Sequence, residues 1–255
     1  MLVLGLDTAT SACAAALWRD GAVLAVRAMA LQRGQAEWLL PLVGGVLEEA
    51  GVGYADLDRI GVVTGPGTFT GLRIGLAAAR GLALATGRPL AGFSSFEAAL
   101  HGTDPAARAG TTVLCCIESR RDDLYLQPFG PDLAPLADPA DVLPADLPGW
   151  AAATLPPGPL LLAGDAAERT AAALGPWPAG LSVHRSTGAA EAVAVARLTA
   201  GLDADALAAR PADPFYLRPP DVTLPSGVHV PAVVPAVPPG GPPDALPGTL
   251  PGGRG

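Results

Sequence analysis

The 255-residue sequence contains no lysine and no asparagine, and all 16 of its basic residues are arginines. Without lysine, the chain has neither Schiff-base chemistry nor the lysine that P-loop and kinase sites require. Without asparagine, it has no N-glycosylation acceptor site. Of its three cysteines, Cys115 and Cys116 are adjacent within an apolar run, which is typical of small core residues rather than of a disulfide framework.

Long apolar runs are also missing, although half of the residues are hydrophobic. No run reaches the roughly 18 residues that a membrane span needs, so we expect no membrane partner. The N-terminus lacks the basic start of a signal peptide and carries Asp7 too early for one. Together with the few cysteines, these features favour a cytoplasmic protein.

The excess of negative charge limits the possible partners. The net charge is −8, and the arginines are scattered apart from Arg120 and Arg121, which two aspartates follow. Phosphate contacts dominate the affinity for nucleic acid, and they come from basic patches. If the chain acts on nucleic acid, we therefore expect another protein to hold it.

Signatures of metal sites and hydrolases are absent as well. His101, His184 and His229 lie far apart, and none has a second histidine or a cysteine three or four residues away. A metal site built on a helix needs such a pair. There is also no Gly-x-Ser-x-Gly elbow of a serine hydrolase. We predict no catalytic residue and no metal, so elemental analysis should find no stoichiometric zinc, iron or nickel.

The most informative segment is residues 61–85, GVVTGPGTFTGLRIGLAAARGLALA. An apolar run ends at the Gly-Pro-Gly turn of 65–67, and Thr68 or Thr70 can cap the helix that follows. A P-loop would end in Gly-Lys-Ser/Thr, whereas residues 71–73 are Gly-Leu-Arg. A tight turn before a capped helix is therefore favoured over nucleotide binding, although a helix N-terminus can attract phosphate.

The predicted helix 69–86 is apolar on every side, and small residues recur along it at every fourth position. Such a helix is buried on two sides, here by its own sheet and by a partner. Helix 35–50, which has a helical apolar period, should complete the partner surface. The predicted interface residues are Leu39, Val43, Leu47, Gly71, Gly75, Ala79 and Leu82. Alone, the chain should form a homodimer through them, and arginine at position 79 should prevent association.

The order of the predicted elements indicates a duplicated α/β unit. The first half is expected to contain strand 2–8, a hairpin of strands 12–19 and 22–29 around Asp20-Gly21, helix 35–50, strand 59–64, helix 69–86 and strand 89–93. The second half repeats this order more weakly, with hairpin strands 112–118 and 124–129, strand 159–163, helix 165–174, strand 181–184 and helix 189–200. This order is typical of the actin-like, ribonuclease-H-like fold and not of a Rossmann-type sheet.

Three parts are expected along the chain. Residues 1–100 should form an N-terminal actin-like domain, and residues 101–218 a smaller C-terminal α/β domain. The remaining residues, 219–255, include 11 prolines and 7 glycines. Such a segment can neither pair into a sheet nor form a helix efficiently, so we predict a disordered tail whose removal leaves the folded core intact.

Asp7 closes the first predicted strand and is followed by Thr8 and Thr10. In actin-like ATPases this position holds an aspartate and a small-residue turn that face the nucleotide phosphates and magnesium. The three residues are therefore candidates for a vestigial phosphate turn, with Ala9 in the place of the usual glycine. Asp7 and Thr8 can equally serve as caps of a hairpin turn, and both interpretations stay open.

Five motifs together suggest a family. They are Asp-Thr-Ala-Thr at 7–10, Leu-Leu-Pro at 39–41, Gly-Pro-Gly-Thr-Phe-Thr-Gly-Leu-Arg-Ile-Gly at 65–75, Ile-Glu-Ser-Arg at 117–120 and Tyr-Leu-Arg at 216–218. They resemble the bacterial TsaB family of tRNA threonylcarbamoyladenosine biosynthesis. The resemblance covers residues 1–218, and its central glycine motif is highly specific.

The resemblance implies an actin-like fold without catalysis of its own. The paralogue TsaD carries the metal and transfers the threonylcarbamoyl group, TsaB pairs with it through the two helices that are here 35–50 and 69–86, and the ATPase TsaE joins them. The His-x-x-x-His pair of TsaD is missing here, and Gln35 replaces a histidine common in TsaB. The resemblance implies that the chain binds no cofactor by itself and that ATP is bound only within the complex.

Two other functions remain open from the sequence. One is an independent actin-like small-molecule kinase or ATPase, which the absent lysine and the altered phosphate turn disfavour. The other, with less support, is a metallopeptidase-like protein that acts on partner proteins, which the lack of clustered ligands disfavours. Calorimetry with ATP and the isolated chain distinguishes the first alternative from a non-catalytic subunit.

Overall fold

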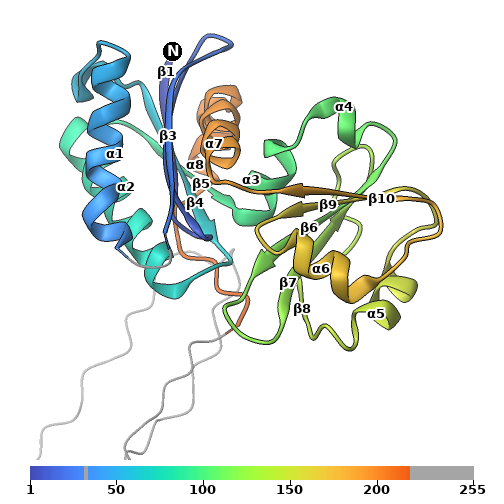
Figure 1. Cartoon of the computed structure of the whole chain (residues 1–255). Helices are drawn as coiled ribbons and strands as arrows, with labels where there is room; N and C mark the ends of the chain where they lie inside the picture. The colour runs from blue at the N-terminus through green and yellow to red at the C-terminus, as the bar shows by residue number, and fades with distance from the viewer. Residues whose placement is uncertain (32–33, 219–255) are drawn as a thin grey trace, which may run out of the picture. The chain divides into compact units, whose positions relative to one another are not determined.

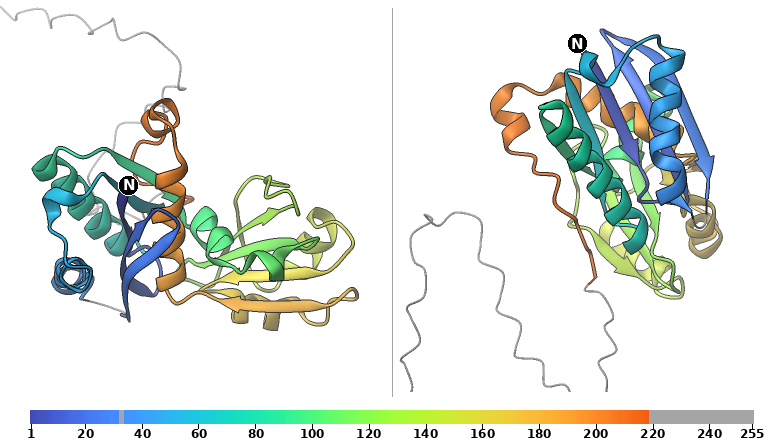
Figure 2. Two further views of the ribbon diagram at one scale, coloured as in Figure 1. Left: turned by 90° about the horizontal axis from the view of Figure 1, so that it is seen from above. Right: turned by 90° about the vertical axis from the view of Figure 1, so that its left-hand side faces the viewer.

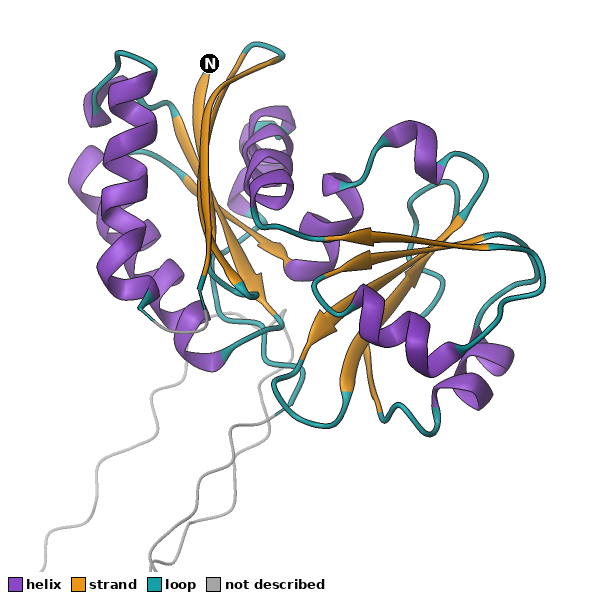
Figure 3. Cartoon of the chain, in the orientation of Figure 1, coloured by secondary structure: helices purple, strands orange, loops and turns teal. Residues whose placement is uncertain are grey.

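Two five-stranded mixed sheets carry the fold of the computed structural model, which describes residues 1–31 and 34–218 (Figure 3). All described residues belong to one compact unit. The tail predicted at 219–255 lies outside the described residues. Because each sheet begins with an antiparallel hairpin and continues with parallel strands, the predicted duplication of an α/β unit is confirmed.

The first sheet has the strand order β3-β2-β1-β4-β5. Its strands are β1 (Leu2–Asp7), β2 (Ala12–Arg19), β3 (Ala22–Ala30), β4 (Arg59–Gly65) and β5 (Leu90–Ser94). The hairpin of β2 and β3 turns at Asp20 and Gly21, whose φ angles are 48° and 94°. Both angles are positive, as the favoured two-residue hairpin turn requires, which explains the Asp-Gly pair.

Helices cover both faces of this sheet (Figure 1). Helices α1 (Gln35–Glu49) and α2 (Phe69–Thr86) pack side by side on one face, and α7 (Ala189–Gly201) packs on the other. The approach of α7 is so close that a Cβ at Gly5 or Gly61 would collide with it. Both positions therefore require glycine for packing rather than for an unusual backbone angle.

The second sheet has the order β10-β9-β6-β7-β8. Its strands are β6 (Thr112–Glu118), β7 (Leu124–Phe129), β8 (Ala140–Val142), β9 (Leu160–Gly164) and β10 (Leu181–Arg185). Helices α5 (Leu147–Thr154) and α6 (Ala167–Leu174) pack with Cys116 on one face. Helix α3 (Ser95–Gly102) packs with Cys115 on the other, so the two adjacent cysteines serve two different cores, as small apolar residues.

Every strand and helix named from the sequence is present, within one or two residues at each end. The sequence analysis missed the shorter elements, which are α3, α4 (Pro105–Arg108), α5, α8 (Ala204–Ala208), β8 and a 3₁₀ turn at Tyr54–Asp56. The division at residue 100 stays a prediction. Helix α7, from the second half of the chain, returns to the first sheet, as Figure 2 shows.

Candidate functional site

Helices α1 and α2 form the first candidate site, and local chemistry sets their ends. The Thr68 hydroxyl accepts a hydrogen bond of 3.2 Å from the Gly71 N–H, so Thr68 is the N-cap of α2. Gly87, with φ 68°, ends α2 in the left-handed region. Helix α1 starts after Gly34 and contains Pro41 in its second turn.

The glycine stripe of α2 faces its own chain. A Cβ at Gly71 would collide with the Thr8 carbonyl oxygen, and one at Gly75 with the Thr8 side chain. The Thr8 hydroxyl also donates a hydrogen bond of 2.7 Å to the Gly71 carbonyl. The close backbone approach that the stripe permits is therefore made by the turn between β1 and β2.

The structure corrects which residues of α1 and α2 can reach a partner. Leu82 is half-buried, and the other six residues predicted for the interface are buried inside the chain: Leu39, Val43, Leu47, Gly71, Gly75 and Ala79. Arginine at Ala79 would enter the core of the first sheet, so it should unfold the chain rather than only block association. Association through these helices stays a prediction, with other residues at the surface.

The solvent-facing side of the pair, here named the outer helix face, consists of Trp38, Leu40, Phe69, Ala77, Gly81, Leu84 and Ala85. Leu84 is 87% exposed, Leu40 50%, Trp38 45% and Phe69 40%. Figure 2 shows the two helices side by side in front of the strands. Exposed large apolar side chains on two neighbouring helices make this side of the chain a candidate interaction surface.

Charge is divided between the two helices. Helix α1 carries only acidic side chains, Glu37, Glu48 and Glu49, whereas α2 carries only Arg73 and Arg80. Arg73 lies 3.8 Å from the centroid of the Phe69 ring. Of the two helices that carry the outer helix face, α1 is therefore negative and α2 positive.

The predicted phosphate turn is buried and packed against α2. Asp7, Thr8 and Thr10 are all buried. One Asp7 carboxylate oxygen accepts a hydrogen bond of 2.9 Å from the Ala9 N–H, and the Ala9 carbonyl accepts one of 2.7 Å from the Thr68 N–H. Asp7 therefore caps the turn, and the Thr8 hydroxyl joins the turn to α2. A nucleotide role for the three residues stays a prediction.

Asp7 sits in an unusual electrostatic environment. Burial, and to a smaller extent the nearby carboxylates of Glu191 and Asp165, raise its pKa to about 8, against the hydrogen bond from Ala9. Its second oxygen has no hydrogen-bond partner among the described residues, and neither has one oxygen of Glu191. At neutral pH, Asp7 is therefore mostly a neutral acid.

The second half of the chain contributes Asp165 to the same region. This residue follows β9, and its carboxylate accepts hydrogen bonds from the N–H groups of Ser11, at 3.2 Å, and Glu118, at 3.0 Å. Burial raises its pKa, which the Glu118 hydrogen bond opposes. No local sequence pattern predicts this contact, because Ser11 lies 154 residues away.

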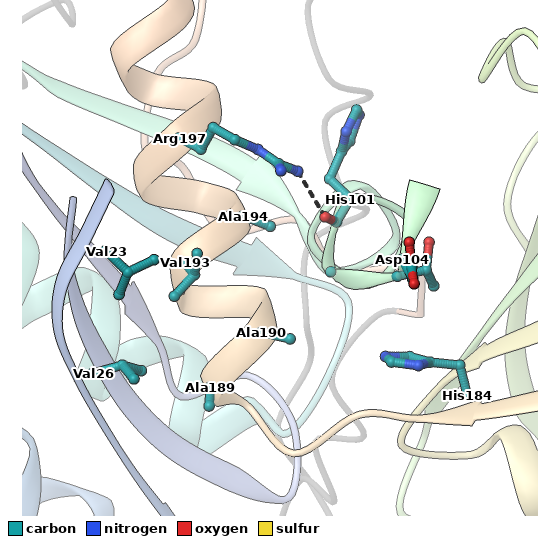
Figure 4. Close-up of a pocket in the computed structure, with 12 residues that line it drawn as sticks. Val23, Val26, His101, Asp104, His184, Ala189, Ala190, Val193, Ala194 and Arg197 are labelled. Carbon is teal, nitrogen blue, oxygen red and sulfur yellow. Dashed lines mark hydrogen bonds between the residues drawn. The ribbon is translucent and has the colours of Figure 1, made fainter. Parts of the chain in front are cut away.

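Two of the histidines that lie far apart in sequence line one pocket of about 510 Å³. His101 and His184 lie with Asp104 on one side of it, and Val23 and Val26 lie on the other (Figure 4). Burial lowers the pKa of His101, and nearby arginines lower it further. No group of three or more potential ligands that could hold a metal is found in 1–31 and 34–218.

The cysteines of the described chain are not activated nucleophiles. All three are buried and unpaired. Burial raises the pKa of Cys13 to about 11 and that of Cys116 to about 12, and it raises the pKa of Cys115 well above the ordinary value. The thiols therefore stay protonated at neutral pH and act as core residues.

Comparison with known proteins places this arrangement in a family. The family model described as TsaD, tRNA N6-adenosine threonylcarbamoyltransferase, matches residues 29–159, which are 131 of the 255. The chain is 37% identical over 125 residues to the tRNA threonylcarbamoyladenosine biosynthesis protein TsaB of Escherichia coli, covering 49% of this chain and 53% of that protein. The chain thus spans about half the length of the TsaB proteins it matches first.

Solved structures agree with this result. YeaZ from Pseudomonas aeruginosa is similar with a TM-score of 0.67 and 26% identity, over 85% of this chain and 99% of that one. Component A of the Acidaminococcus fermentans (R)-2-hydroxyglutaryl-CoA dehydratase shares the fold, with a TM-score of 0.52 at 11% identity, over 77% of this chain and 96% of that one. The actin-like fold is confirmed. The chain belongs to the TsaD family and is a TsaB/YeaZ-like member of it.

No helix among the described residues combines the length and apolarity that crossing a membrane requires.

Proposed function

We propose that the chain is a non-catalytic subunit in the formation of threonylcarbamoyladenosine next to the anticodon of tRNA. The name of its Escherichia coli relative supports this pathway. Buried thiols and a largely neutral Asp7 support a role without chemistry of its own. In this role the chain binds no cofactor by itself, and tRNA and ATP belong to the assembled complex.

The observation that carries the proposal is the outer helix face. It exposes four large apolar side chains on two adjacent helices, of which Leu84 is the most exposed at 87%. We propose that the TsaD catalytic subunit covers this face, that a second copy covers it when TsaD is absent, and that the TsaE ATPase joins the pair. TsaD can cover this face in the same way as a second copy of the chain, because the two proteins belong to one family.

The charges support a symmetric pairing. In a two-fold dimer, α1 of one copy can lie against α2 of the other, since the same surfaces meet twice. Acidic α1 would then face basic α2 across the interface, bringing Glu48 near to arginines of opposite charge. Complementary charges of this kind set the register of an interface.

The test is Leu84→Arg, with Leu136→Arg as the matched control, because Leu136 is an exposed leucine outside this face at 44%. Burying a charged guanidinium in place of the apolar Leu84 side chain carries a desolvation cost even beside the acidic α1 of the partner, so Leu84→Arg should weaken both association with TsaD and self-association by about tenfold or more. Sedimentation measures the dimer, pull-down with TsaD of the same organism measures the complex, and circular dichroism verifies folding. Leu136→Arg should behave as the unmodified chain.

Two results would contradict the proposal. A folded Leu84→Arg variant that binds TsaD normally and supports threonylcarbamoyladenosine formation with TsaD and TsaE would place the interface elsewhere. Stoichiometric binding of ATP to the isolated chain, measured by calorimetry, would favour an independent actin-like ATPase instead.

A further inference from the structure

The carboxylate of Asp165 joins the two sheets. One oxygen accepts from the N–H of Ser11, in the turn between β1 and β2 of the first sheet. The other accepts from the N–H of Glu118, at the end of β6 in the second sheet. A single side chain therefore satisfies backbone donors from two sheets, and each of its oxygens serves one of them.

Helix capping does not account for this side chain. An aspartate just before a helix ordinarily caps it by accepting from the first free N–H groups. Here α6 begins at Ala167, its N-cap residue is Ala166, and no side chain caps it. Instead of capping α6, the Asp165 carboxylate accepts hydrogen bonds from backbone N–H groups that are distant in sequence.

The carboxyl groups near Asp165 make its position unfavourable unless hydrogen bonds compensate for the repulsion. Asp165 is close enough to Asp7 to raise its pKa, and the charge of Glu118 raises that of Asp165. Bringing carboxyl groups together in a partly buried region is unfavourable unless hydrogen bonds hold them. The bonds from Ser11 and Glu118 supply that compensation, together with the charge of Arg120.

Backbone N–H groups that converge from two turns commonly form a cradle for a phosphate or another oxyanion. We propose that Asp165 is an internal clasp, whose carboxylate occupies such a cradle and ties the β1–β2 turn to the end of β6, so that the two sheets stay closed over Asp7. The inference is independent of the partner bound at the outer helix face.

The test is hydrogen exchange of assigned amides by NMR in the full chain, comparing Asp165→Ala and Asp165→Asn with the control Glu168→Ala. Glu168 lies three residues further on, on the exposed side of α6, and forms an ion pair of 3.7 Å with Arg185. A clasp predicts that exchange of the Ser11 and Glu118 amides rises together by roughly tenfold or more in Asp165→Ala, since each amide loses its hydrogen-bond acceptor. The control should leave both amides unchanged.

Asp165→Asn keeps the shape but retains only one accepting oxygen, so it should expose one of the two amides more than the other. It also serves if Asp165→Ala does not fold. Unchanged exchange at Ser11 and Glu118 in the folded variants would overturn the proposal. So would changes confined to the first amides of α6, because they would identify Asp165 as a helix-capping residue.

Discussion

Replacing Asp7 by asparagine should stabilise the protein at neutral pH and change how stability depends on pH. The folded chain holds a proton on Asp7 up to about pH 8, whereas an unperturbed aspartate releases it near 3.8. Unfolding between these values therefore releases a proton. Stability should fall as pH rises from about 4 to about 8, and be independent of this group outside that range.

The magnitude follows from the separation of the two pKa values. Each pH unit in this window costs about 1.4 kcal/mol for one proton, so about three units correspond to about 4 kcal/mol at pH 7. Asparagine is neutral throughout, has nearly the same shape, and its carbonyl can keep the bond from the Ala9 N–H. It should remove this loss. Glu191 and Asp165, whose charges act on Asp7, are present in both proteins.

The assay is urea denaturation at pH 5 and at pH 7.5 for the unmodified chain, Asp7→Asn and the exposed control Asp138→Asn. Because all other titrations cancel in the comparison, the stability gained by Asp7→Asn should be larger at pH 7.5 by several kcal/mol. The control should follow the unmodified chain. Equal gains at the two pH values would refute the argument, since they would mean that Asp7 is ionised in the folded protein.

Two further predictions concern packing. Gly75→Ala should lower the free energy of unfolding in urea by about 1–3 kcal/mol, because its Cβ would overlap Thr8. Gly81→Ala should leave it unchanged or raise it by up to about 1 kcal/mol, because nothing lies within 4 Å of the added Cβ. Equal effects of the two substitutions would contradict the orientation of α2. Cys13, Cys115 and Cys116 are buried, so their thiols should not react with a disulfide reagent at pH 7.5 until the chain unfolds. Rapid labelling of the folded protein would contradict this prediction, because it would mean that solvent reaches the thiols.

Local chemistry made much of the fold predictable. The Asp20-Gly21 turn and the Thr68 cap each follow from residues next to one another in the chain. Helix α3 was also within reach, because Ser94 and Glu97 form a capping box whose spacing the sequence carries. The short helix was missed because eight residues are too few to show a clear helical repeat of apolar residues.

The orientation of α2 could not be predicted in the same way. The helix carries two stripes of small residues, one with Gly71 and Gly75 and one with Ala77 and Gly81, and apolar periodicity does not distinguish them. The position of Thr8, more than 60 residues away, decides which stripe is buried. The contacts of Asp165 escaped prediction for the same reason, since distant pairings have no signature in a single sequence.

The lack of space between α2 and the turn at Thr8 has a mechanical consequence. Gly71 and Gly75 leave no room for even one methyl group, so the turn and the helix must shift as one rigid body. The opposite side of that helix carries Leu84 and the other α2 residues of the outer helix face. A load applied there is transmitted directly to the segment that holds Asp7 and Ser11, and any force that separates the two sheets pulls on the helix in return.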